Sequence, residues 1–205
     1  MPYGSLRLLD KSVEVIMNFF LSLSRGIDTI TNAIGKITFW LTTVMVLVGA
    51  YNVITRYLSR WIGIQLSGNV YFELQTYAYD LIFLLGAAYV FSQNGHVRVD
   101  IIFSNLKEKT RAWIDVFGAM LFLVPFCWLG IFLSRKYVAD SWRVFEQSPN
   151  PGGLPRYPMK TVIIMAFALL IIQAISETIK NIAFIRGHEN SGSVHDPKRG
   201  LGGAH

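Results

Sequence analysis

The sequence predicts an all-α integral membrane protein with four transmembrane helices. Of its 205 residues, 52% are hydrophobic and 16% are charged, and the mean hydropathy is +0.40. The apolar residues gather in blocks, whereas a soluble domain of this size would alternate apolar and polar positions. These blocks have the length that a membrane-spanning helix needs, about 20 residues. Composition and block length together therefore argue for a membrane protein.

Residues 1–34 are expected to form an amphipathic segment at the membrane surface ahead of the first span, with a helix over residues 5–24. Polar side chains recur there every three or four residues, and apolar side chains line the other side. Asp10 and Glu14 interrupt the apolar character, which argues against a fifth span. Gly26 and Gly35 allow bends between this segment and the first span.

Residues 35–184 are expected to form the membrane domain. The predicted spans are residues 36–57, 70–93, 113–134 and 157–180. Pro125 should kink the third span, because proline lacks the backbone N–H that an α-helix needs. The last segment, residues 185–205, is rich in glycine, histidine and charge, and we expect a disordered cytoplasmic tail.

The distribution of basic residues predicts the orientation of the spans. The segments on the side of the two termini hold 12 lysines and arginines, and the opposite segments hold 7. Basic residues are enriched on the cytoplasmic side of membrane proteins, so both termini are predicted to be cytoplasmic. The net charge is +6, but the basic residues lie at the ends of apolar blocks. Phospholipid headgroups are therefore a better partner for them than nucleic acid.

Two carboxylates fall within the second predicted span, Glu73 and Asp80. Each would cost roughly 2.5–3.5 kcal/mol near mid-membrane, so each should face protein or water. Arg56, at the end of the first span with Asn52 one turn away, is the expected cation for Glu73. Asp80 has no assignable partner in the chain and could be protonated, hydrated or paired with another subunit. Intrachain polar packing that fixes the helix register is an alternative for both carboxylates.

A short polar stretch between the second and third spans contains His96, Arg98 and Asp100 at alternate positions. This spacing could suit a metal, but stable metal sites need three or four ligands, and no second histidine or cysteine is nearby. We expect His96 and Asp100 to shape the loop or contact another subunit. No metal and no cofactor is predicted for this chain.

Four motifs together carry a resemblance to a known family: Tyr51–Tyr57, Phe72–Gln75, Leu85–Tyr89 and His96–Asp100. In these motifs the chain resembles the small membrane subunit (DctQ-like) of tripartite ATP-independent periplasmic (TRAP) transporters. Residues 141–160 are similar to the branch for mannitol, chloroaromatic and 2-oxo-acid uptake.

The resemblance implies a non-catalytic scaffold subunit of a sodium-coupled importer in the bacterial cell inner membrane. Its implied partners are a large multi-span membrane subunit, which would hold the substrate and sodium sites, and a periplasmic substrate-binding protein that delivers an organic acid. Trp61, Arg143 and Arg156 are candidates for contact with the binding protein. Candidates for structural or subunit contacts are Asn52, Arg56, Glu73, Asp80, His96 and Asp100.

Two alternatives come from other classes of protein. A membrane-anchor subunit of a redox complex would hold haem between histidines inside the spans, but all four histidines lie outside the apolar blocks. A stand-alone small transporter or channel would be expected to show internal repeats with matched broken helices, and none is evident. No enzyme site can be assembled from the residues.

Overall fold

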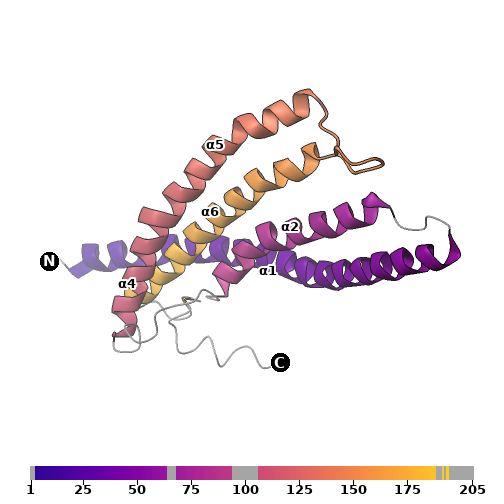
Figure 1. Cartoon of the computed structure of the whole chain (residues 1–205). Helices are drawn as coiled ribbons and strands as arrows, with labels where there is room; N and C mark the ends of the chain where they lie inside the picture. Colours follow the sequence, from indigo (N-terminus) through magenta and orange to yellow (C-terminus); the bar gives the residue numbers. More distant parts are fainter. Residues whose placement is uncertain (1–2, 64–67, 94–105, 188–190, 192, 194–205) are drawn as a thin grey trace. The chain divides into compact units, whose positions relative to one another are not determined.

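The computed structural model describes residues 3–63, 68–93, 106–187, 191 and 193, with residues 3–13 as backbone. The described residues contain helices, turns and bends, and no strand (Figure 1). Four stretches of helix among them are long and apolar enough to cross a membrane. The predicted all-α membrane fold with four spanning helices is therefore confirmed. The elements are α1 Tyr3–Ile62, α2 Asn69–Ser92, α4 Glu108–Gly118, the π-helix η1 Ala119–Leu123, α5 Val124–Arg143 and α6 Tyr157–Ile185.

Helix α1 joins two segments that the sequence suggested were separate. It runs for 60 residues through Gly26 and Gly35, so no break separates an N-terminal helix from the first span. A glycine inside a helix costs about 1 kcal/mol relative to alanine. Glycine permits a bend but does not impose one, so the helix continues through both positions.

The third spanning stretch changes helix type just before Pro125. Five residues, Ala119–Leu123, form a π-helix between α4 and α5. A π-turn accommodates a break in the regular α-helical hydrogen bonding, which a proline causes because it has no N–H to donate. This π-helix ends two residues before the proline, and the predicted kink at Pro125 itself stays a prediction.

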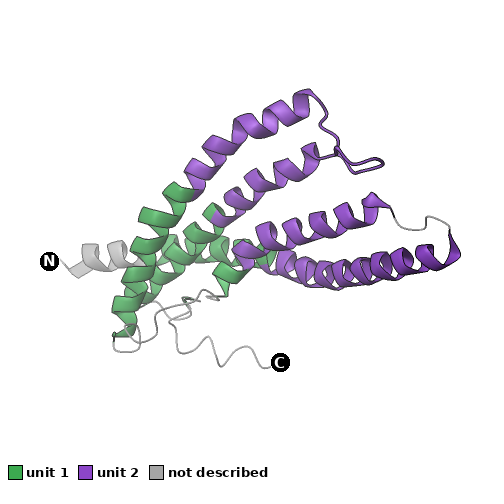
Figure 2. Cartoon of the chain, in the orientation of Figure 1, with its two compact units in different colours: residues 1–31, 90–126, 171–205 green, residues 32–89, 127–170 purple. Residues whose placement is uncertain are grey.

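The chain divides into two compact units (Figure 2). Unit 1 comprises residues 1–31, 90–126 and 171–205, and unit 2 comprises residues 32–89 and 127–170. In unit 1, Met17 and Leu21 of α1 pack against Ala183 of α6, and Ile179 and Ile182 border this core. The N-terminal part of α1 is therefore seated on α6 by one face.

In unit 2, glycines allow neighbouring helices to approach closely. A Cβ atom at Gly130 of α5 would lie 2.7 Å from the ring of Phe167 of α6, and Gly35 of α1 likewise faces the Tyr89 ring of α2. Many large apolar side chains remain exposed, such as Phe39 and Trp40 on α1. Such surfaces suit a lipid or protein environment and would be costly in water.

Two residues of the last segment are packed, in contrast to the predicted disorder. Ser191 and Ser193 are buried, and Ser193 Oγ donates a hydrogen bond to Asn181 Oδ1 of α6 at 2.6 Å.

Candidate functional site

The carboxylate of Glu73, near the start of α2, is bound by the loop between α5 and α6, residues 144–156. It accepts hydrogen bonds from the Ser148 hydroxyl, from Asn150 Nδ2 at 2.8 Å and from the Leu154 backbone N–H at 2.6 Å. Glu73 is only 6% exposed. The prediction that Arg56 pairs with Glu73 is therefore wrong: the loop supplies the donors, and the described ion pairs do not include these two residues.

The backbone of the loop is shaped to admit this carboxylate. Gly152 has φ +70°, a left-handed conformation that glycine adopts without a steric penalty. At Gly153, an added Cβ would lie 2.7 Å from Glu73 Oε2. The absence of a side chain at Gly153 thus leaves room for an acidic side chain from another helix.

A second tie fastens the same loop to α6. Glu146 accepts hydrogen bonds from Lys160 Nζ and, at 2.7 Å, from the Ser141 hydroxyl. These donors, the lysine first, hold the pKa of Glu146 below its ordinary value. The Tyr77 hydroxyl of α2 adds a bond to the Pro155 carbonyl at 3.2 Å. The loop is therefore bound by α2, α5 and α6.

Asp80, the second predicted carboxylate, lines a pocket of about 410 Å³ between α2, α5 and α6. Arg156 and Lys160 line the same pocket, and Lys160 Nζ lies 3.9 Å from the centre of the Tyr137 ring. Asp80 makes no hydrogen bond and no ion pair with any described residue.

The three candidates for contact with a binding protein lie in different settings. Trp61 is 89% exposed at the end of α1. Arg143 is exposed at the end of α5 and lies 3.5 Å from the Asp140 carboxylate. Arg156 is half-buried, and its backbone N–H donates to the Glu146 carbonyl at 2.9 Å. Arg143 thus directly precedes the 144–156 loop and Arg156 is its last residue, while Trp61 belongs to α1.

Asn52 and Arg56 line a groove between α1 and α2, of about 730 Å³. Asn52 is 6% exposed and its Oδ1 has no hydrogen-bond partner in the described structure. His96 and Asp100, the remaining candidates, lie outside the described residues.

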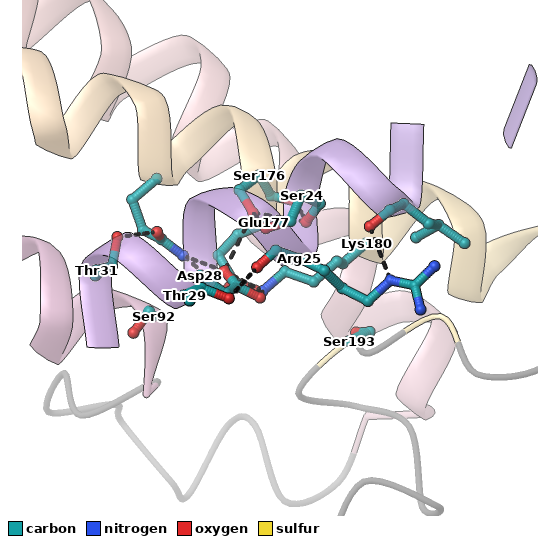
Figure 3. A network of polar contacts seen from close by, with 12 residues as sticks. Ser24, Arg25, Asp28, Thr29, Thr31, Ser92, Ser176, Glu177, Lys180 and Ser193 are labelled. Carbon is teal, nitrogen blue, oxygen red and sulfur yellow. Dashed lines mark hydrogen bonds and ion pairs between the residues drawn. The ribbon is translucent and has the colours of Figure 1, made fainter. Parts of the chain in front are cut away.

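One polar cluster was not predicted as a site. On the N-terminal part of α1, Ser24, Asp28 and Thr31 lie beside Ser176, Glu177 and Lys180 of α6 (Figure 3). Gln173 of α6 bonds to Thr31 and Asp28. Lys180 Nζ contacts Asp28 Oδ2 at 2.9 Å and Glu177 Oε1 at 2.5 Å. We call these seven residues the α1–α6 network.

The amide of Gln173 connects the hydroxyl side of this network to its charged side. Its Oε1 accepts from Thr31 Oγ1 at 2.7 Å, and its Nε2 donates to Asp28 Oδ1 at 2.9 Å. The Ser24 and Ser176 hydroxyls lie 2.6 Å apart. Because Gln173, Ser176 and Lys180 are almost fully buried, these bonds compensate for the loss of hydration.

A comparison with protein-family models gives one match that covers most of the chain. Residues 45–184 match the family of tripartite ATP-independent periplasmic transporters, DctQ component. The chain belongs to the DctQ family. No curated protein and no solved structure matches it.

The DctQ match covers the groove, the 144–156 loop and all of the α6 side of the α1–α6 network. It begins after Ser24, Asp28 and Thr31, so the α1 side of that network lies in the part of the chain that precedes the match. Family membership and the four apolar helices identify a multi-pass membrane protein that is a transporter component. In the tripartite system, the DctQ component works with a large membrane subunit and a periplasmic binding protein.

Proposed function

We propose that this DctQ component is the small accessory subunit of a sodium-coupled importer of an organic acid in the bacterial inner membrane. The observation that carries the proposal is the family match over residues 45–184. The excess of basic residues on the segments that hold the two termini supports a cytoplasmic location for both ends. The 144–156 loop would then face the periplasm.

The role proposed for the chain is that of a scaffold for the large transport subunit, which would hold the substrate and sodium sites. Asn52, Arg56 and Asp80 support this role, because each is a polar side chain in or beside a span without a partner in the described structure. Polar groups at membrane depth are stable only when another polar group or water reaches them. A second membrane protein can supply such groups.

Affinity purification from native membranes tests this role. We expect a tagged version of the chain to recover the TRAP large subunit in a fixed ratio. Recovery of the chain alone, as a stable monomer under mild detergent conditions, would contradict the scaffold role. Robust solute flux from liposomes that contain only this chain would instead favour a stand-alone transporter.

We further propose that the 144–156 loop, together with the preceding Arg143, helps to hold the periplasmic binding protein. Arg143 and Arg156 supply positive charge at the two ends of a loop that hydrogen bonds to Glu73 and Glu146 already hold in place. A double charge reversal, R143E/R156E, should lower uptake at limiting binding-protein concentration. The matched control, K107E/K109E, reverses two charges on the predicted cytoplasmic side and should leave uptake unchanged. Equal uptake by both variants would remove the docking role.

Neither a cofactor nor an enzymatic activity is part of the proposal for this chain. The rival function from another class, a haem-holding membrane anchor, makes a distinct spectroscopic prediction. Purified protein would then show a Soret band, and we expect none.

A further inference from the structure

The groove between α1 and α2 holds four polar side chains that share one property. Asn52, Arg56 and Arg60 of α1 and Gln75 of α2 all line it. No side chain of these four makes a hydrogen bond or an ion pair with any residue that the structure describes. Elsewhere in the described chain, buried amides such as Gln173 are fully engaged. The groove is therefore unusual within this molecule.

The groove changes in character along α1. Its lining positions follow a spacing of three or four residues, so they form one face of the helix. Arg60 and Arg56 lie toward the Ile62 end of α1, and Asn52 lies about 6 Å further into the span at 1.5 Å per residue. Val53 and Phe72 supply apolar walls. The groove thus has positive charge at the end near Ile62 and amide groups further into the span.

Gly49 of α1 leaves the space that the Gln75 side chain occupies. A Cβ atom at Gly49 would lie 3.0 Å from Gln75 Nε2, so the glycine lets the Gln75 side chain lie against α1. Gly49 is about 10 Å along the helix axis from Arg56. Gln75 therefore reaches the groove at a depth well inside the apolar layer.

We propose that this groove receives a transmembrane helix of the large subunit. The inference rests on the proposed function and specifies the contact face. That helix would carry a carboxylate opposite Arg56 and Arg60, and a hydroxyl or amide side chain opposite Asn52 and Gln75. A carboxylate complements the charge of the two exposed arginines, and the two amides require a partner with hydrogen-bonding groups at membrane depth.

A phospholipid fits the groove less well than a helix does. Its phosphate could neutralise the two arginines at the membrane surface. Its acyl chains would then cover Asn52 and Gln75 and leave both amides without hydrogen bonds in hydrocarbon. A protein helix can bind the arginines near the membrane surface and the amides deeper in the span at once, because it presents a side chain on the same face at every turn.

Site-specific photocrosslinking of the assembled transporter tests the assignment. The chain is co-expressed with its tagged large subunit and carries a photoreactive phenylalanine analogue either at Val53 or at Ile54. Val53 lines the groove, whereas Ile54 is similarly exposed on the same helix but does not line it. We expect crosslinks to the large subunit from Val53 at a yield at least about fivefold higher than from Ile54.

Two substitutions add an independent measurement. Arg56→Glu places a negative charge where the proposal requires a positive one and should reduce recovery of the large subunit about tenfold. Lys36→Glu, an equal charge reversal on an exposed position of α1, should leave recovery unchanged. Asn52→Leu keeps the net charge and should lower recovery less than Arg56→Glu does.

The outcomes separate the two proposals. Crosslinks from Val53 to phospholipid alone, with the large subunit still recovered, would make the groove a lipid site and overturn the inference while the proposed function stands. Equal yields from Val53 and Ile54 would also overturn it. Failure of the unmodified chain to recover the large subunit would instead refute the proposed function.

Discussion

Replacing Lys180 with methionine removes the one cation of the α1–α6 network. The Lys180 side chain is 3% exposed and its ammonium lies between two carboxylates, 2.9 Å from Asp28 and 2.5 Å from Glu177. Methionine has a similar length and no charge, so the helix keeps its apolar packing. The substitution leaves two acidic groups close together without a counter-ion.

The size of the effect follows from burial. Removing one partner of a buried ion pair costs about 3–5 kcal/mol, because the other partner is left charged and poorly hydrated. The Asp28 side chain is 23% exposed and can recruit water, whereas that of Glu177 is 8% exposed. We therefore expect the lower part of that range, about 3 kcal/mol, which is roughly a 100-fold change in the unfolding equilibrium.

Unfolding by SDS in mixed micelles, followed by circular dichroism, measures the change in free energy. Lys36→Met serves as the control, because Lys36 is exposed on α1 and its loss should change stability by less than about 0.5 kcal/mol. The triple variant D28N/E177Q/K180M removes all three charges and keeps both side-chain oxygens as acceptors for Gln173. It should recover at least about half of the loss caused by K180M.

Two results would refute this reasoning. The first is a Lys180→Met variant as stable as the Lys36→Met control. The second is a triple variant no more stable than Lys180→Met, which would mean that lost packing, and not uncompensated charge, causes the effect.

Three further predictions concern unit 2. Gly130→Ala should destabilise the protein by about 1–3 kcal/mol through overpacking against Phe167. Gly118→Ala is the control, because a Cβ there meets nothing within 4 Å, and it should be neutral or mildly stabilising. Equal thermal midpoints for the two variants would contradict this prediction. The pKa of Glu146 is lowered in the folded state, so its stabilising contribution is present above its ordinary value of 4.5 and is lost as pH falls through the lower folded value. The thermal midpoint should therefore drop more steeply below pH 4.5 in the wild type than in Glu146→Gln, and parallel curves would argue against it. Glu73→Gln should speed hydrogen exchange of the loop amide that the carboxylate holds at 2.6 Å, and unchanged exchange would show that the loop is held by other bonds.

The helices could be predicted because a bilayer leaves few choices. Every backbone group in lipid must bond within its own segment, so a long apolar run such as that of α6 can only be a helix. The continuity of α1 could not be read from Gly26 and Gly35, since glycine permits a bend but does not impose one.

The hydrogen-bond partners of Glu73 could not be predicted from the sequence. An arginine at matching depth is the obvious choice from spacing, but the actual donors include the backbone N–H of Leu154, which no residue type reveals. The α1–α6 network left a clearer signal. Gln173, Glu177 and Lys180 recur every three or four residues on one helix face, yet the sequence alone does not show which other helix covers that face.

The hydrogen bonds that hold the 144–156 loop preorganise the surface that it offers to a binding partner. Glu73 of α2 accepts hydrogen bonds from the loop, and Glu146 of the loop accepts them from Lys160 of α6 and Ser141 of α5, so the loop is already fixed before another protein binds. A binding partner would therefore pay little conformational entropy to order the loop. Its affinity would depend on how well the two preorganised surfaces complement each other. Removing the hydrogen bonds of either Glu73 or Glu146 should then weaken binding, chiefly because the loop would have to be ordered on binding. This effect does not require either side chain to contact the partner.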